Sequence, residues 1–241
     1  MVSKNKQLDK SLSLIAKTSV FLLIGILISK ILTYVYRIII ARYFGPDTYG
    51  IFSISLIILS LAVSISSLGL AEGLLRYIPL YRGKKEKAKI SYLVKFSLSI
   101  SVISSLVFSI ILFIFSGQIA NLFNNQDLTL FIKIFSFLIP VYVICNIYLS
   151  IIKSFEKVII YSFLVNIIQN IAKLSFLIVL IYLGFNNSSI AYSYFIGVLL
   201  ILLLAYLICK YKIPEAFTFH SLDKNSKKEI KNEIISYSWP I

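Results

Sequence analysis

Six long apolar runs decide what this chain can fold into. A helix needs about 20 residues to cross the hydrocarbon core of a bilayer, whereas a membrane-spanning β-strand needs about 10 residues of alternating polarity. The runs are long and do not alternate, so they predict an all-α, polytopic membrane protein with six transmembrane helices. They cover approximately Leu14–Ile40, Ile51–Leu70, Leu93–Phe115, Leu130–Ile152, Ile159–Tyr182 and Ile190–Ile208, and a seventh begins at Ile234–Ile241.

The composition agrees with a lipid-exposed chain. Of its 241 residues, 59% are hydrophobic and 14% are charged, and the mean hydropathy is +0.90. Soluble domains contain about 45–50% apolar and about 25% charged residues, and roughly 55–60% of their surface is already apolar. The apolar excess must therefore face lipid, which excludes a soluble enzyme, a disordered chain and a fibrous chain.

The distribution of positive charge predicts the orientation in the membrane. The formal net charge is +14, and 19 of the 24 lysines and arginines lie before the first run, after the second, fourth and sixth runs, or, for Lys17 and Lys95, within the first four residues of the first and third runs. The loops Gly117–Thr129 and Gly184–Ser189 contain none. Cytoplasmic loops collect lysine and arginine, so we expect a multi-pass protein of the cell (plasma) membrane with a cytoplasmic N-terminus. Because topology explains the charge, we expect no nucleic-acid partner.

A stripe of polar residues in the fifth run is the first candidate for a substrate site. Asn166, Gln169, Asn170 and Lys173 are spaced i, i+3, i+4 and i+7, which places them on one helical face. Ionisable groups inside a membrane usually face protein or water rather than lipid. The stripe therefore predicts a cavity wall that binds substrate. Polar side chains that hold helices together, or a lysine that extends to the interface, are the alternatives.

The first run carries a second candidate set. Lys30 and Arg37 lie on one face of the predicted helix, together with Thr33 and Tyr34. We predict that both cations line the same cavity as Lys173, the alternative being that they extend to the membrane interface.

Glu72 and Arg76 lie four residues apart near the cytoplasmic end of the second run. Their spacing permits an i, i+4 ion pair of a few tenths of a kcal/mol, and a gate contact is a second interpretation. Otherwise the runs contain several cations and no deep acid. A cationic cavity suits a phosphate or pyrophosphate, whereas an exporter of cationic drugs would need a deep carboxylate.

The sequence contains nothing that indicates catalysis. It has one histidine, His220, and two cysteines, Cys145 and Cys209, which cannot form a metal cluster. It also lacks a nucleophile elbow, an HExxH motif, a Walker loop and a dinucleotide-binding motif. We therefore expect neither an enzyme nor a bound metal or cofactor.

Three short motifs give the chain a resemblance to a known family. They are ARYFGPDTYG at residues 41–50, SLGL at 67–70 followed by RYIP at 76–79, and SYSWP at 236–240. The first is the most specific of them. Together they resemble the polysaccharide (Wzx-type) flippases of the multidrug/oligosaccharidyl-lipid/polysaccharide exporter superfamily. Lys30 falls where the related lipid II flippases carry a cavity arginine, counted back from the first motif.

This resemblance implies two six-helix lobes around a central cavity that opens to each side of the membrane in turn. The substrate would be a lipid-linked oligosaccharide, moved from the cytoplasmic to the outer leaflet. A multidrug or cation exporter of the same fold, or an inactive N-terminal fragment of a flippase, is the alternative.

The sequence predicts three segments, and they correspond to the first lobe of such a protein. Residues 1–208 form the six-helix lobe, 209–233 a cytoplasmic linker with a possible interfacial helix, and 234–241 the start of a seventh helix. We expect a missing C-terminal lobe, or a separate partner lobe, to complete the cavity. The sequence does not identify the sugar, the lipid carrier or the energy source.

Overall fold

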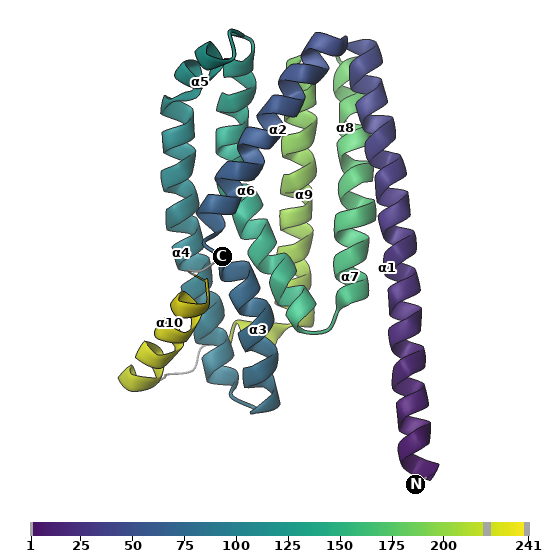
Figure 1. Cartoon of the computed structure of the whole chain (residues 1–241), viewed down its shortest axis with the longest axis vertical. Coiled ribbons are helices and arrows are strands. Elements are labelled where there is room, and N and C mark those ends of the chain that lie inside the picture. Colours follow the sequence, from purple (N-terminus) through teal and green to yellow (C-terminus); the bar gives the residue numbers. More distant parts are fainter. Residues whose placement is uncertain (1, 219–222, 239–241) are drawn as a thin grey trace.

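The computed structural model describes residues 2–218 and 223–238, and all the regular structure in these residues is helical (Figure 1). Six of its segments are long and apolar enough to cross a membrane: Thr18–Tyr43, Pro46–Ser67, Lys87–Ile114, Leu128–Ser154, Val158–Tyr182 and Ser188–Lys212. They agree with the six predicted spans to within a few residues, so the predicted fold class is confirmed. Large apolar side chains such as Leu23, Ile57 and Ile110 remain exposed, as a lipid-facing surface requires.

The elements follow one another in this order: α1 (Val2–Tyr43), α2 (Pro46–Ser67), α3 (Leu70–Gly83), α4 (Lys87–Ile114), α5 (Ser116–Leu122), α6 (Leu128–Ser154), α7 (Val158–Ser162), a π-helix (Phe163–Ile168), α8 (Gln169–Tyr182), α9 (Ser188–Lys212), a short 3-10 helix (Pro214–Ala216) and α10 (Lys224–Ser238). The fifth span is thus one continuous helix made of α7, the π-helix and α8. It stands beside α1 at one side of the bundle (Figure 1).

Helix α6 lies at the centre of the bundle and contacts α2, α3, α4 and α9. Half of the residues in its most apolar 18-residue stretch are buried, the largest share among the six spans. Phe131, Phe135 and Leu138 are fully enclosed there. A row of serines on α4, including Ser101, Ser105 and Ser109, allows that helix to approach α6 closely. The Ser109 hydroxyl donates to the Ser136 carbonyl oxygen over 2.7 Å.

The predicted C-terminal end of the second span, Leu70, is wrong. Helix α2 ends at Ser67, and the chain turns through Leu68 (φ 49°) and Gly69 (φ 64°) before α3 begins. Two successive residues in the left-handed region cannot continue an α-helix. The residues that follow, predicted as a loop, form α3 instead, because Leu70, Leu74 and Ile78 recur at helical spacing and are buried. Glu72 and Arg76 therefore lie on α3.

Helix α10 crosses the predicted boundary between the linker and the seventh helix. It runs from Lys224 to Ser238 without a break at residues 233 and 234. Ile230 and Ile234 are buried against α3 and α4, because their i, i+4 spacing gives this helix one apolar face. Residues 239–241, the last three of the predicted start of the seventh helix, lie outside the described part of the chain.

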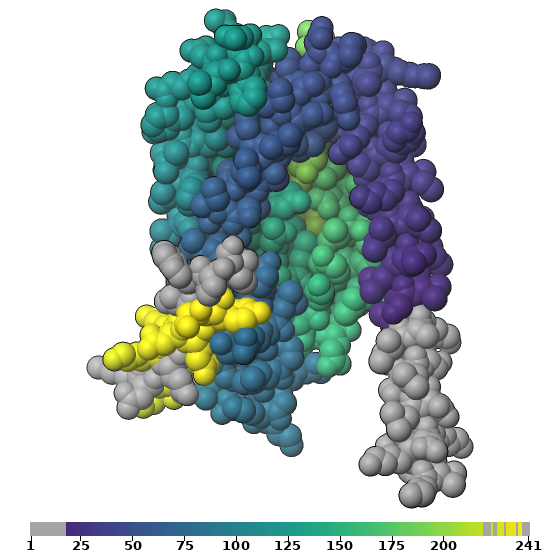
Figure 2. Space-filling view, viewed as in Figure 1, coloured from purple at the N-terminus to yellow at the C-terminus, as the bar shows by residue number. Residues whose placement is uncertain are grey.

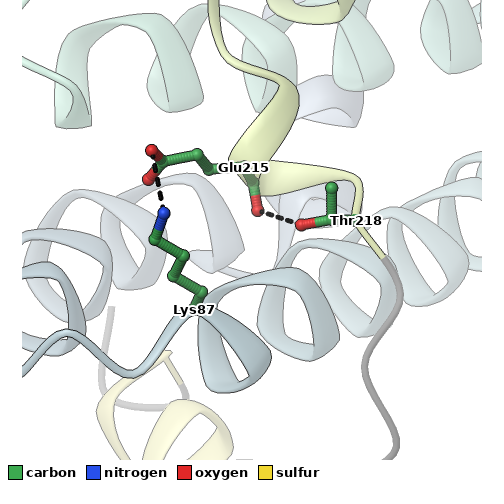
Figure 3. Close-up of polar contacts among 3 residues, drawn as sticks. All are labelled: Lys87, Glu215 and Thr218. Carbon is green, nitrogen blue, oxygen red and sulfur yellow. Dashed lines mark hydrogen bonds and ion pairs between the residues drawn. The ribbon is translucent and has the colours of Figure 1, made fainter.

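Basic residues gather at one end of the bundle, which we call the lysine-rich end. It comprises the α3–α4 turn, the α6–α7 turn and the end of α9. Lys87 at the start of α4 pairs with Glu215 over 3.2 Å, and the Thr218 hydroxyl donates to the Glu215 carbonyl oxygen (Figure 3). Lys157 donates to the carbonyl oxygen of Lys212 at the end of α9. Desolvation, and secondarily the charge of Lys212, lowers the pKa of Lys157.

Candidate functional site

Three adjoining cavities form a groove along one face of the bundle, which we call the central groove. The first, of about 450 Å³, lies between α1 and α2 and is lined by Arg37 and Ser60 among others. The second, of about 470 Å³, shares Ser60 with the first. The third, of about 350 Å³, shares Glu72 with the second and reaches Lys153 at the lysine-rich end. Figure 2 shows this face hollowed between α2 and α1, with the fifth span at its floor.

The polar lining of the groove includes side chains from six elements. Arg37 is on α1, Ser60 and Ser67 are on α2, and Glu72 is on α3. Helices α6, α8 and α9 add Tyr142 and Asn146, Gln169, and Tyr194 respectively. A groove with this many hydrogen-bonding groups, inside a segment that spans a membrane, is suited to water or to a polar ligand rather than to lipid tails.

Arg37, Gln169 and Glu72 are the predicted site residues that the structure places in the groove. Arg37 and Glu72 are exposed, so their charges are accessible from it. Gln169 lines the third cavity together with Glu72. The Arg37 guanidinium lies in the first cavity, which we call the Arg37 part of the groove, whereas the Glu72 carboxylate shares the third cavity with Lys153.

Lys173 lies behind the wall of the groove. Its ammonium nitrogen is 3.9 Å from the centroid of the Tyr194 ring, and Tyr194 lines the second cavity. The face of an aromatic ring attracts a cation, and more strongly where water is excluded. Gly197 makes this contact possible, because a Cβ atom there would lie 2.6 Å from Cγ of Lys173. Lys173 therefore contacts a residue of the groove, Tyr194, but lines none of the three cavities itself.

Asn166 and Asn170 contact helix α1 instead of the groove. The Asn170 amide donates to the Ser29 hydroxyl over 2.9 Å, and its side-chain oxygen accepts from Thr33 over 3.4 Å. Asn166 donates to Ser162 over 2.9 Å, and both side chains lie beside Gly25 of α1. The Asn170 bonds are interhelical contacts of the kind that was the alternative interpretation of the stripe, whereas the Asn166 bond lies within the fifth span.

The side chains of the predicted stripe face different neighbours because they point in different directions around the fifth span. Successive residues are about 100° apart in an α-helix, so Gln169 and Asn170 point to different neighbours. The π-helix at Phe163–Ile168 adds a further rotation between Asn166 and the rest. Consequently Asn170 faces α1, Gln169 faces the groove and Lys173 faces α9.

Lys30 is exposed on α1 and lines none of the three cavities. It lies about two helical turns before Arg37 on the same face of α1, so it extends the row of cations that Arg37 begins.

Glu72 and Arg76 do not pair. Within the described part of the chain, no ion pair joins them, and the Arg76 guanidinium lies over the Tyr237 ring of α10, 4.5 Å from its centroid. Tyr77 donates to the Glu233 carbonyl oxygen, and the Tyr81 hydroxyl bonds the Glu233 carboxylate. Arg76 therefore helps to fasten α10 to α3, while Glu72 faces the groove.

Tyr142, Asn146 and Tyr194 line the groove but were not predicted. Asn146 was detectable as a single amide within the fourth apolar run. The tyrosines carry no such signal, because a tyrosine in a membrane helix is as consistent with packing as with a polar cavity.

Replacing Asn170 with leucine is expected to lower the stability of the protein by about 1–2 kcal/mol. The change removes the bonds to Ser29 and Thr33, and interhelical hydrogen bonds in membranes are worth about 0.6 kcal/mol on average and about 1.7 kcal/mol at most. Thermal unfolding in detergent, followed by circular dichroism, measures the effect. Ser175→Leu, at an exposed position on the same helix, is the control and should unfold like the wild type. Equal stability of the two variants would show that Asn170 does not hold α1 in place.

Comparison with known proteins supports the fold and identifies the family. Residues 15–241 match the family model described as "Polysaccharide biosynthesis protein". No curated protein matches the chain. An outward-facing multidrug resistance MATE family transporter of the MOP superfamily superposes with a TM-score of 0.70 at 16% identity. A MOP superfamily transporter from Pyrococcus furiosus, described as having a binding pocket of reverse polarity, gives a TM-score of 0.65, also at 16% identity.

Each superposition covers 93% of this chain and 51% of the other, so the chain spans about half the length of both transporters. The six spans therefore have the fold of one half of a MOP transporter, as the motifs implied. Since the family model covers most of the sequence, the chain belongs to the polysaccharide biosynthesis protein family.

Proposed function

We propose that this chain forms one lobe of a flippase that moves a lipid-linked oligosaccharide across the cell membrane. The observation that carries the proposal is the central groove, a polar groove with Arg37 in its lining, on a lobe that exposes many large apolar side chains along its membrane spans. A polar surface of this kind is stable within a membrane only if it faces water or protein. In a two-lobe transporter it would face the second lobe and form half of the substrate cavity.

The charge of the groove supports an anionic headgroup as the substrate. Arg37 presents an exposed guanidinium, and Lys30 lies on the same face of α1. A guanidinium binds phosphate oxygens through two parallel hydrogen bonds. A lipid-linked oligosaccharide carries a phosphate or pyrophosphate between lipid and sugar, which matches this arrangement. The family description is consistent with such a substrate.

The orientation follows from the lysine-rich end. The α3–α4 turn carries Arg82, Lys84 and Lys85, whereas the loops at the other end of the bundle carry no lysine or arginine between residues 117 and 129 or 184 and 189. By the positive-inside rule the lysine-rich end is cytoplasmic. Substrate would then enter near Glu72 and Lys153 and leave near Arg37, by rocking of the two lobes. The protein would act as a transporter rather than as an enzyme.

Glu72 favours a second candidate, an exporter of cationic drugs. The sequence contains no deep acid in the other runs, and Glu72 was predicted only as a possible gate, but it lines two of the three cavities. A carboxylate in a membrane groove can bind a cationic substrate or a proton.

Replacing Glu72 with glutamine in the chromosomal gene distinguishes the two candidates. A flippase whose substrate binds near Arg37 should retain most of its activity, so the amount of lipid-linked glycan on the outer leaflet should fall less than about threefold. An exporter should lose resistance to cationic drugs, because the charge that attracts them is gone. Labelling of outer-leaflet glycan and drug-susceptibility assays are the measurements. Loss of drug resistance with unchanged glycan would replace the proposal with the exporter.

A further inference from the structure

A further cavity, of about 830 Å³ and separate from the three of the central groove, lies at the end of the bundle opposite the lysine-rich end. Three connections meet there: the α1–α2 turn, the α5–α6 loop and the α8–α9 turn. We call this cavity the turn pocket. Its floor is apolar and includes Ile51 and Phe131, which belong to the packed core. Its rim is polar and comes from segments far apart in the sequence.

The main chain around the turn pocket is held in place by its own hydrogen bonds. The Ser189 amide and hydroxyl both donate to the Asn186 carbonyl oxygen, over 2.9 and 2.6 Å. The Thr129 amide donates to the Gln126 carbonyl oxygen over 3.0 Å. Gly184, with a φ of 80°, permits the turn that leads to Asn186. The side chains on these turns are therefore presented from a fixed backbone, which lowers the entropic cost of binding.

The lining combines neutral amides with aromatic rings. Gln126, Asn186 and Asn187 are exposed, and each amide offers both donors and acceptors. The aromatic residues Tyr43 and Phe185 are 63% and 46% exposed. A sugar ring presents hydroxyl groups at its edge and C–H groups on its face, so amides and aromatic rings together match it. Sites for small polar ligands commonly combine apolar walls with a few convergent polar groups.

The charge of the turn pocket argues against a phosphate ligand. Its charged lining residues are Asp127 and Lys133, which balance each other, and the Lys133 ammonium lies 5.7 Å from the centroid of the Phe113 ring. A phosphate would need a cluster of cations or a guanidinium. An uncharged, polyhydroxylated ligand fits better.

The turn pocket lies next to the Arg37 part of the central groove. Tyr49 and Phe52 line the groove beside Arg37, and Ile51 between them lines the turn pocket. Both sites thus flank the first turns of α2. A substrate with its phosphate near Arg37 would have its sugars close to this end of the lobe.

We propose that the turn pocket binds the uncharged glycan portion of the transported molecule at the exit side of the membrane. This inference rests on the proposed flippase function. It assigns the sugar and the phosphate to different sites, the sugar to Gln126, Phe185 and the neighbouring amides, and the phosphate to the groove.

The test measures binding of free glycan to the full chain in lipid nanodiscs. The probe is the neutral oligosaccharide released by mild acid from the lipid-linked glycans of cells that make the protein. Saturation-transfer NMR should detect transfer of saturation from the protein to the sugar-ring protons of this oligosaccharide. Phe185→Ala and Gln126→Ala should each weaken the apparent Kd about tenfold, the loss expected for one well-placed contact. Tyr182→Ala, at a 91% exposed residue outside the pocket, is the matched control and should bind like the wild type.

Binding of the intact lipid-linked glycan is titrated in parallel with the wild type and with Arg37→Glu, so that the two proposals fail separately. Absence of transfer to the free glycan, or transfer that both pocket variants leave unchanged, overturns the turn pocket as a glycan site. If the intact molecule still binds in an Arg37-dependent way, the flippase proposal survives that result. Conversely, glycan binding that depends on Phe185, with intact substrate indifferent to Arg37, supports the turn pocket and overturns the groove as the phosphate site.

Discussion

Replacing Arg37 with glutamate is expected to reduce outward movement of lipid-linked glycan at least about 100-fold. The change replaces the cation of the Arg37 part of the central groove with an anion. The phosphate loses a charge-assisted hydrogen-bonding partner and meets a like charge, and each loss of about 1.4 kcal/mol weakens binding tenfold. Accumulation of the glycan on the cytoplasmic leaflet, in cells that carry the variant in the chromosome, measures the effect.

Arg42→Glu is the matched control for this prediction. Arg42 lies five residues further along α1, is exposed and lines none of the described cavities. The same reversal of charge there should leave most of the transport intact. Arg37→Lys should retain part of the activity, because it keeps the charge but loses the forked geometry. Equal transport by the Arg37→Glu and Arg42→Glu variants would rule out the groove as the binding site for the phosphate.

Replacing Gly197 with valine is expected to cost about 1–3 kcal/mol of stability, the usual range for overpacking. A Cβ atom at this position would lie 2.6 Å from Cγ of Lys173 and 3.4 Å from its backbone nitrogen, so α8 and α9 would have to separate. The ammonium would also leave the face of the Tyr194 ring. Thermal unfolding in detergent measures the loss.

Two further variants separate this clash from a general effect of valine in a helix. Gly50 lies in α2 with nothing within 4 Å of its added Cβ, so Gly50→Val should be nearly neutral. Lys173→Ala removes the Cγ atom, and the double variant with Gly197→Val should therefore recover part of the lost stability. Strictly additive effects of the two substitutions would show that Gly197 and Lys173 do not compete for the same space.

Hydrophobic length was enough to predict the six spans, because a membrane leaves few alternatives. Each backbone amide inside lipid must find a partner in its own segment, so a long apolar run becomes a helix whatever its neighbours are. The α2–α3 break escaped this argument. Leu68 and Gly69 interrupt the helix through their backbone angles. Apolar residues continue past them to Leu70 and Ala71, so hydropathy alone does not mark the break.

The candidate site was predictable in its residue types but only partly in its geometry. Polar and charged residues within apolar runs pointed to Arg37 and Gln169, which lie in the groove. The same argument treated Asn166, Asn170 and Lys173 as one surface with Gln169. The structure divides them among helix α1, the ring of Tyr194 and the groove, because each residue on a helix meets a different neighbour.

The sequence by itself determined that this chain is helical, embedded in a membrane and strongly basic at one end of its bundle. These properties depend on the free energy of moving each segment from water into lipid, which is a sum over its own residues. Only the tertiary structure decided that Glu72 faces the groove while Arg76 lies against Tyr237, and that three distant turns enclose one pocket. Those outcomes depend on how helices far apart in the sequence pack together, and no local pattern encodes that packing.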